Sequence, residues 1–173
     1  TDGRLYSWGD NGFGELGDGG TETSSDIPVA VDMSGALVGK TISAISAGPV
    51  TSLVLTTDDR LYSWGSGKLG DGGDEENSNV PVAVDMSGVL AGKTISAIAV
   101  GDDFCLVLTA DGQLYSWGDN TSGQLGDGGS EGFSNVPVAV NMSSALAGKT
   151  VSAIAAGDHS LVLTTDGGLY SWG

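Results

Sequence analysis

One pentapeptide, Leu-Tyr-Ser-Trp-Gly, occurs four times in this chain and constrains its fold more than any other feature. The copies begin at Leu5, Leu61, Leu114 and Leu169, so successive copies start 56, 53 and 55 residues apart. A fixed period of about 50 residues is typical of repeat architectures, in which each copy is one small structural unit. The sequence therefore predicts an array of similar units rather than one irregular domain.

Two strands joined by a tight turn are predicted around the pentapeptide. In the first copy, Tyr6 and Trp8 should share one face of a strand. In the later copies a Leu-Val-Leu-Thr run comes shortly before it, and the lack of polar alternates predicts burial on both faces. Asp-Gly joins the two runs in two copies, and we expect a hairpin whose central residues both have positive φ. Asp58 and Asp59 replace this dipeptide in the other copy.

Two further strands complete each unit. The sequence Pro-Val-Ala-Val begins at Pro28, Pro81 and Pro137. A proline at the first residue of a strand donates no ladder hydrogen bond, so we expect this to be an edge strand. A short turn over residues 33–40 then leads to a strand of small residues at 41–48, and both recur in the later copies.

Four strands of this kind suit a wedge, because one strand carries small residues and another carries Tyr and Trp. We therefore predict an all-β chain, a β-propeller built of four-stranded antiparallel blades. Residues 1–40 should form the last two strands of one blade, and 150–173 the first three strands of another. Two whole blades are expected between them, at residues 41–93 and 94–149.

The chain is strongly acidic, with six Lys and Arg against 22 Asp and Glu and a net charge of −16. Lys40, Lys93 and Lys149 occupy one repeat position and are spread along the array, so no basic patch forms and we expect no nucleic-acid binding. No apolar run reaches the roughly 18 residues of a membrane span, so no membrane insertion is expected. The lone Cys105 allows no internal disulfide and is predicted to be a small buried hydrophobic residue.

Two motifs suggest ligand chemistry but fit it poorly. The run Gly-Ala-Leu-Val-Gly-Lys-Thr at 35–41 has three residues between its glycines, whereas a phosphate-binding loop needs four and leads into a helix. The Asp-rich loop at 10–20 and its repeats leave calcium binding as an open alternative, although the spacing differs from a twelve-residue calcium loop. His159 has no partner for a catalytic triad. No enzyme activity, cofactor or resident metal is therefore predicted.

The units resemble the regulator of chromosome condensation repeat family. The matching residues run from Ala-Gly through Leu-Val-Leu-Thr, Asp-Gly and Leu-Tyr-Ser-Trp-Gly to an Asp-Asn-x-x-Gly-Gln-Leu-Gly-Asp-Gly loop, best kept at 119–128. The family commonly has His before the second strand, which only His159 retains, while Thr51 and Phe104 stand there in the other copies. The resemblance implies a propeller of seven blades, which needs roughly 350 to 400 residues, so about three blades are present here. It leaves the function open, because members serve as nucleotide-exchange factors, light sensors, inhibitors and surface adaptors.

The connections after the pentapeptides are predicted to form the binding surface. The strands repeat nearly verbatim, whereas residues 21–26, 74–79 and 130–135 differ between copies, and variation on a rigid scaffold is typical of binding loops. Random drift in unconstrained loops is the alternative. The predicted partner-binding rim residues are Glu22, Asp26, Asp74, Glu75, Glu76, Glu131 and Phe133. The predicted core anchors are Trp8, Trp64, Trp117 and Trp172.

We therefore expect a non-enzymatic scaffold that binds a protein or other macromolecule, in a bacterial extracellular or cell-surface setting, with a cytoplasmic one as the alternative. The resemblance also suggests an exchange factor for a small GTPase, although no inserted hairpin stands out. A third hypothesis is assembly with further copies or blades, because an open arc would leave Leu161, Leu163 and Trp172 bare. Asn120 and Asn141 each begin a tripeptide that matches the glycosylation pattern.

Overall fold

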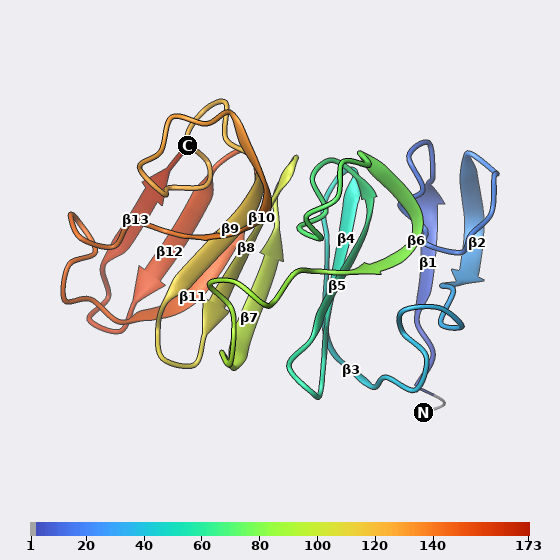
Figure 1. The fold of residues 1–173 in the computed structure, drawn as a ribbon, viewed down its shortest axis with the longest axis horizontal. Helices are drawn as coiled ribbons and strands as arrows, with labels where there is room; N and C mark the ends of the chain where they lie inside the picture. The colour runs from blue at the N-terminus through green and yellow to red at the C-terminus, as the bar shows by residue number, and fades with distance from the viewer. Residues whose placement is uncertain (1–2) are drawn as a thin grey trace.

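Within residues 3–173, thirteen strands, all paired antiparallel, make up the regular structure. The computed structural model describes residues 3–173, and no helix occurs in that range. Figure 1 shows the strands grouped in separate sheets that stand next to one another as blades along the chain. The predicted all-β fold with four-stranded antiparallel sheets is therefore confirmed.

Each sheet is one blade, and its strands follow one another as a simple meander. Blade 1 consists of β1 (Tyr6–Asp10) and β2 (Ser24–Ala30). Blade 2 consists of β3 (Ile42–Ala47), β4 (Thr51–Thr56), β5 (Leu61–Ser66) and β6 (Asn77–Ala83). Blade 3 consists of β7 (Ile95–Val100), β8 (Phe104–Thr109), β9 (Leu114–Asp119) and β10 (Phe133–Ala139). Blade 4 consists of β11 (Val151–Ala156), β12 (Ser160–Thr164) and β13 (Leu169–Trp172).

The connections alternate between the two ends of the blades, because each blade is an antiparallel meander. One end, the loop end, holds the long loops that follow β1, β5 and β9 and the short turns that follow β3, β7 and β11. Its segments are 10–26, 48–51, 66–77, 101–104, 119–133 and 157–160. The other end, the turn end, holds the tight hairpins within blades and the connections between blades. Its segments are 3–5, 31–41, 56–61, 84–94, 109–113, 140–150 and 164–168.

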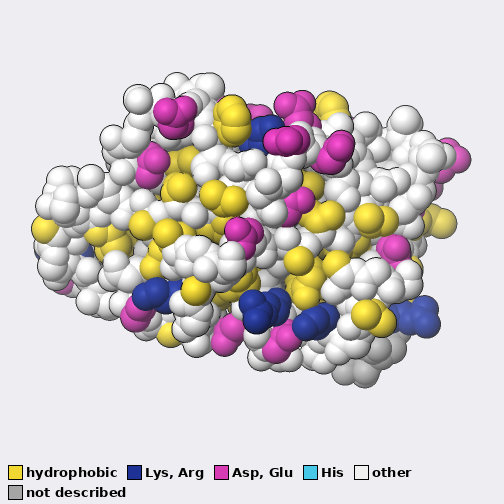
Figure 2. All heavy atoms as spheres, in the orientation of Figure 1, with side chains coloured by type: hydrophobic (Ala, Val, Ile, Leu, Met, Phe, Trp, Pro, Cys, Tyr) yellow, Lys and Arg dark blue, Asp and Glu magenta, His cyan; other side chains and the backbone are white. Residues whose placement is uncertain are grey.

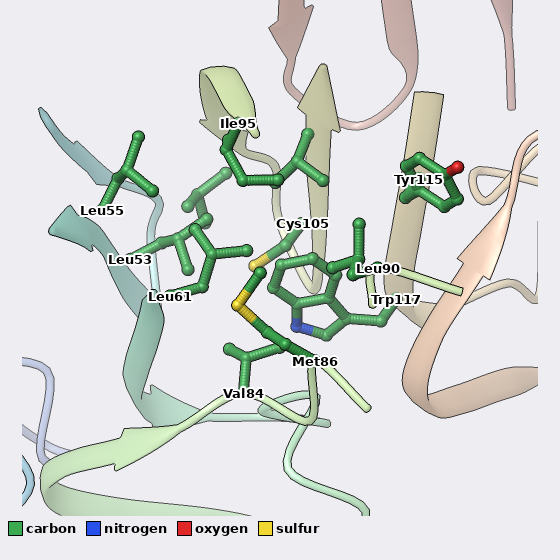
Figure 3. Packing of buried hydrophobic residues seen from close by; sticks show 12 residues of the cluster. Leu53, Leu55, Leu61, Val84, Met86, Leu90, Ile95, Cys105, Tyr115 and Trp117 are labelled. Atoms are coloured by element: carbon green, nitrogen blue, oxygen red, sulfur yellow. The ribbon is translucent and has the colours of Figure 1, made fainter. Parts of the chain in front are cut away.

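The core lies between blades rather than within one sheet. Its largest cluster brings Leu53 and Leu61 of blade 2 against Cys105, Val107 and Trp117 of blade 3, as Figure 3 shows for most of them. Comparable clusters join blade 1 to blade 2 and blade 3 to blade 4. Because each buried Leu or Val side chain stabilises the fold by about 1.5–3 kcal/mol, contacts between blades hold the array together.

The Leu-Val-Leu strands are buried on both faces where a blade lies on each side. Leu53 and Leu106 are fully buried, as predicted. In β12, however, Leu163 is 41% exposed, because no further blade covers that side within residues 3–173.

The outermost strands begin four residues before the proline, so the predicted start at the proline was wrong. Pro28 is the fifth residue of β2, and Pro81 and Pro137 hold the same place in β6 and β10. Ser25 lies opposite Gly9 and Val29 opposite Ser7, so three residues including Pro28 face a single residue of β1. A proline is tolerated in this irregularity because no ladder hydrogen bond is required there. The edge position of these strands is confirmed.

The tight hairpins have one residue with positive φ, not two as predicted. Gly112 and Gly167 have φ of 79° and 85°, and Asp59 takes their place with φ of 59°. A loop of three residues that ends in such a left-handed residue accounts for this geometry. The preceding aspartate serves differently: Asp111 accepts a hydrogen bond from the Thr109 hydroxyl at the start of the hairpin.

Candidate binding face

All of the predicted rim residues are exposed and lie at the loop end. The prediction that they belong to loops was wrong for two of them, because Asp26 lies in β2 and Phe133 begins β10. These strands start earlier than expected because an irregularity in their pairing accommodates the proline within the strand. The remaining five are in connecting loops: Glu22, Asp74, Glu75, Glu76 and Glu131.

Buried asparagines hold the two long loops in shape. Asn11 Oδ1 accepts a hydrogen bond from the Leu16 amide at 2.9 Å, and its Nδ2 donates to the Glu22 carbonyl at 2.7 Å. Asn120 makes the same two bonds in blade 3, to Leu125 and Glu131. The sequence prediction missed this role, although the repeated Asp-Asn of the loop signalled it. The loops are thus a rigid base for the exposed side chains.

The loop of blade 2 is three residues shorter and lacks this asparagine, and its lysine reaches to the next blade. Lys68 Nζ lies 4.8 Å from the centre of the Phe133 ring and 3.7 Å from a Glu76 carboxylate oxygen. An ammonium group over an aromatic face is attracted by the ring's quadrupole. The loop end therefore holds one cation in a seat made of a phenyl ring and a carboxylate.

A hollow of about 460 Å³ opens at the loop end between blade 1 and β6. Phe13 and Glu22 line it on one side, and Asn77 and Asn79 on the other. Phe13 is 52% exposed. The wall that the loop of blade 1 forms thus offers an aromatic ring and a carboxylate to solvent.

Charge is divided very unevenly between the two ends. The loop-end segments contain fifteen acidic residues and one basic residue, Lys68, whereas the turn-end segments contain six acidic and five basic residues. In Figure 2, acidic side chains gather around a basic one along the upper edge, whereas basic and acidic side chains lie together along the lower edge. The pKa of Asp103 at this end is raised mainly by partial burial, and to a smaller extent by the negative charges of Asp102 and Asp119.

At the turn end, each repeated lysine forms an ion pair with a hairpin aspartate. The pairs are Lys40–Asp58 at 2.6 Å, Lys93–Asp111 at 2.7 Å and Lys149–Asp166 at 2.6 Å. The hydrogen bonds from the lysine and then from a threonine lower the pKa of Asp58 and of Asp111 to about 2. The same aspartates raise the pKa of the lysines. The Gly-Lys-Thr motif is thus part of a structural ion pair.

The repeated tryptophans pack against the loop of the preceding blade. Trp64 Nε1 donates to the Glu15 carbonyl at 2.8 Å, and Trp172 Nε1 donates to the Gln124 carbonyl at 2.9 Å. Trp64 and Trp117 are buried, but Trp8 is 64% exposed, so its predicted role as a core anchor was wrong. The reason is that no earlier loop covers Trp8 within residues 3–173.

Blade 3 departs from this pattern, because Trp117 Nε1 is buried without a hydrogen-bond partner. In blades 2 and 4 a serine, Ser52 or Ser160, donates to the same carbonyl as the tryptophan. Cys105 takes the place of that serine in blade 3, opposite Trp117. It is buried, as predicted, and burial raises the pKa of its thiol, so it is unsuited to act as a nucleophile.

Other ligand chemistry finds little support in residues 3–173. The oxygens of the Asp-rich loop are used internally: Asp10 accepts from the Asn11 and Gly12 amides, and Glu15 from the Phe13 amide. No group of three or more His, Cys, Asp or Glu in that range could hold a metal ion. Asn120 is buried and hydrogen-bonded, whereas Asn141 is exposed. Among the described residues, no helix has the length and apolar character that crossing a membrane requires.

The chain is similar in sequence to curated proteins of much greater length. The human E3 ubiquitin-protein ligase HERC2 is 36% identical over 168 residues, which are 95% of this chain and 3% of that protein. The ultraviolet-B receptor UVR8 of Arabidopsis thaliana is 34% identical over 175 residues, which are 99% of this chain and 37% of the receptor. The chain therefore spans well under half the length of these relatives. They do not support the expected bacterial and extracellular setting, which stays a prediction.

Solved structures agree with the fold. Human WBSCR16 superposes with a TM-score of 0.81 at 26% identity, over 100% of this chain and 43% of that one. Yeast RCC1 (Prp20), solved with Kap60 bound, superposes with a TM-score of 0.77 at 25% identity, over 99% and 40%. The fold of this chain thus matches part of a β-propeller. The sequence-family model described as Regulator of chromosome condensation (RCC1) repeat matches residues 2–55, 58–108 and 111–163 of this chain. This chain therefore belongs to the regulator of chromosome condensation repeat family.

Proposed function

We propose that this chain is a non-enzymatic scaffold that binds a protein partner through its loop end. The observation that carries the proposal is the exposure, on one face, of side chains that differ from blade to blade. Phe13 and Phe133 are 52% and 55% exposed there, among carboxylates held by rigid loops. Exposed aromatic residues are costly in water and are enriched at the centres of protein interfaces.

The contrast between the two ends supports the same proposal. At the turn end the three blades repeat one ion pair, between a lysine and a hairpin aspartate, and that end is structurally uniform. At the loop end, one repeat position holds a glutamate in each copy, namely Glu22, Glu75 and Glu131. The residues around these glutamates differ in type, and the loops differ in length. Selectivity for a partner requires such differences, whereas support of the fold does not.

The relatives are compatible with protein binding. One solved neighbour, yeast RCC1, is seen with Kap60 bound. Another relative, from Bos taurus, is named a secretion-regulating guanine nucleotide exchange factor and is 32% identical over 169 residues. Both statements concern those proteins. For this chain they support a protein partner and leave its identity open.

The proposal is tested by crosslinking and affinity enrichment from an extract of the source organism, with three immobilised chains compared. These are the unchanged chain, a loop-end variant with Glu75→Gln and Phe133→Ser, and a turn-end variant with Asp32→Asn and Asp85→Asn. We expect a specific partner on the unchanged chain and the turn-end variant, and about tenfold less or lower still on the loop-end variant, since loss of an aromatic hot spot costs about 2 kcal/mol or more. A partner lost from the turn-end variant alone, or none on any chain, would contradict the proposal.

A further inference from the structure

The loop end has almost no internal compensation for its negative charge. One ion pair, Lys68–Glu76, lies at that end within residues 3–173, although its segments hold fifteen acidic residues. At the turn end, by contrast, three of the six acidic residues are paired with lysine. Burying uncompensated carboxylates against a neutral or acidic surface is costly, so a partner for this face must supply positive charge.

The one cation at this end shows what kind of group the surface accepts. Lys68 occupies the repeat position of Glu15 and Gln124, whose side chains accept a backbone amide hydrogen bond within their own loops. A lysine ammonium group cannot accept such a bond. The shortened loop has no such amide, and the Lys68 side chain instead lies over Phe133 of blade 3 and near Glu76. A primary ammonium group, a phenyl face and a carboxylate thus already form a complete seat between two blades.

A hollow that is lined by similar chemical groups lies one blade earlier. The hollow between blade 1 and β6 is bounded by Phe13 and Glu22, and no basic residue is among those that line it. Glu22 is the counterpart of Glu75 and Glu131 in the repeat, and its backbone carbonyl is fixed by Asn11. The hollow therefore offers a phenyl ring and a carboxylate, as the occupied seat does, although they come from other repeat positions, and no ammonium group lines it.

We propose that the loop end recognises a lysine- or arginine-rich segment of its protein partner, with one cationic side chain seated in the hollow beside Phe13 and Glu22. This inference rests on the proposed function and names the chemistry of the partner. A long cationic side chain suits the hollow because its methylene groups pack against the phenyl ring while its head meets the carboxylate. The surrounding carboxylates attract the rest of the segment at longer range and increase the rate of encounter.

The test uses a fluorescent peptide of eight lysines as the probe, with a peptide of eight glutamates as the negative control. Binding to the 173-residue chain is measured by anisotropy at 50 mM and at 300 mM NaCl. We expect binding of the lysine peptide only, and a loss of affinity of about tenfold or more at the higher salt, because exposed charges are screened beyond about 10 Å. Binding of the glutamate peptide, or no binding of the lysine peptide, would overturn the proposal.

Substitutions separate the hollow from general charge attraction. Phe13→Ala should weaken binding of the lysine peptide by about two- to fivefold, the range of an exposed cation–π contact, and Phe13→Tyr should restore it. Glu22→Gln should weaken binding more than Asp85→Asn, which removes the same charge at the turn end. Lys68→Gln should tighten binding, because it vacates the second seat at Phe133. Equal losses for Glu22→Gln and Asp85→Asn, or no loss for Phe13→Ala, would sink the assignment to the hollow.

The failure of this inference can be told apart from failure of the proposed function. If the partner found by enrichment is not displaced by the lysine peptide and binds equally at both salt concentrations, the scaffold proposal stands and the cationic partner is wrong. If no partner is retained while the lysine peptide binds with the expected pattern of variants, the chemistry of the face stands and the scaffold function fails.

Discussion

The contact between Trp117 and Gly70 should be one of the most sensitive points of the fold. Gly70 lies in the short loop of blade 2 with φ of 82°, directly against the indole of blade 3. A Cβ at this position would lie 2.6 Å from Trp117 Nε1 and 2.8 Å from Cδ1. The indole is fully buried, so it cannot move into solvent to make room.

The cost of Gly70→Ala has two parts. A left-handed conformation costs a residue with a Cβ about 1–2 kcal/mol, and overpacking a well-packed core costs about 1–3 kcal/mol. We therefore expect a loss of about 2–5 kcal/mol in the free energy of unfolding. Gly92→Ala is the matched control, because Gly92 has φ of 70° but nothing within 4 Å of the added Cβ, and should lose about 1–2 kcal/mol.

The measurement is urea unfolding followed by far-UV circular dichroism. A double-mutant cycle with Trp117→Phe adds a second criterion, because the smaller ring withdraws the atoms that the new methyl group meets. Gly70→Ala should cost less when it is combined with Trp117→Phe than in the unchanged chain, by about 1 kcal/mol or more, within the range of coupling for contacting residues. Equal losses for Gly70→Ala and Gly92→Ala, or no coupling to Trp117, would refute the view that loop-to-tryptophan packing holds neighbouring blades together.

Three further predictions follow from the described contacts. The ion pair of Asp58 with Lys40 lowers the pKa of the aspartate to about 2, so its contribution to stability is present above about pH 4 and is lost as the pH falls from about 4 to about 2. In thermal melts, Asp58→Asn should therefore make the fall of the melting temperature over that pH window shallower. An unchanged slope would contradict this. Cys105→Ser should lower the free energy of unfolding by about 1–3 kcal/mol, because it buries a hydroxyl that has no acceptor. Ser160→Cys, which loses one hydrogen bond, should lower it by about 1 kcal/mol. If Cys105→Ser stabilised the fold, an acceptor would be present after all. The exposed Trp8 predicts concentration-dependent self-association of the 173-residue chain in light scattering, reduced by Trp8→Ser, and a monomer at all concentrations would disprove it.

The repeat made the fold predictable, because the same pattern of strands and turns recurs in every copy. Strand types, blade composition and the burial of Leu53 and Cys105 all follow from local patterns of apolar residues. The start of β2 was missed because Pro28 is a strong local signal for a strand boundary, and an irregularity in pairing that accommodates it leaves no such signal. The burial of Trp8 was overestimated because the pentapeptide is the same in all copies, while its cover comes from a different blade.

The candidate site was predictable only in outline. Differences between copies pointed to the loop end, which stays a proposal as the binding surface. No sequence pattern indicated that Lys68 lies over Phe133, since these residues are far apart in the chain and meet across two blades. Phe13 was not among the predicted rim residues, because the prediction was confined to the variable segments that follow residues 10–20 and their repeats. Its hollow arises from the approach of β6, which is a matter of packing between blades.

The deletion of three residues in the loop of blade 2 connects the unusual features of blade 3 with those of the loop end. It removes the asparagine that shapes the other loops, and no carbonyl takes up the hydrogen bond of the Trp117 indole. A serine beside that indole would then also lack its acceptor, and Cys105 satisfies the position because a thiol tolerates burial without a hydrogen bond. In the same shorter loop, Lys68 stands where the other loops have Glu15 and Gln124, and its side chain lies over Phe133. The shorter loop therefore accompanies both the missing hydrogen bond of Trp117 inside the array and the cation seat of Lys68 at its acidic end.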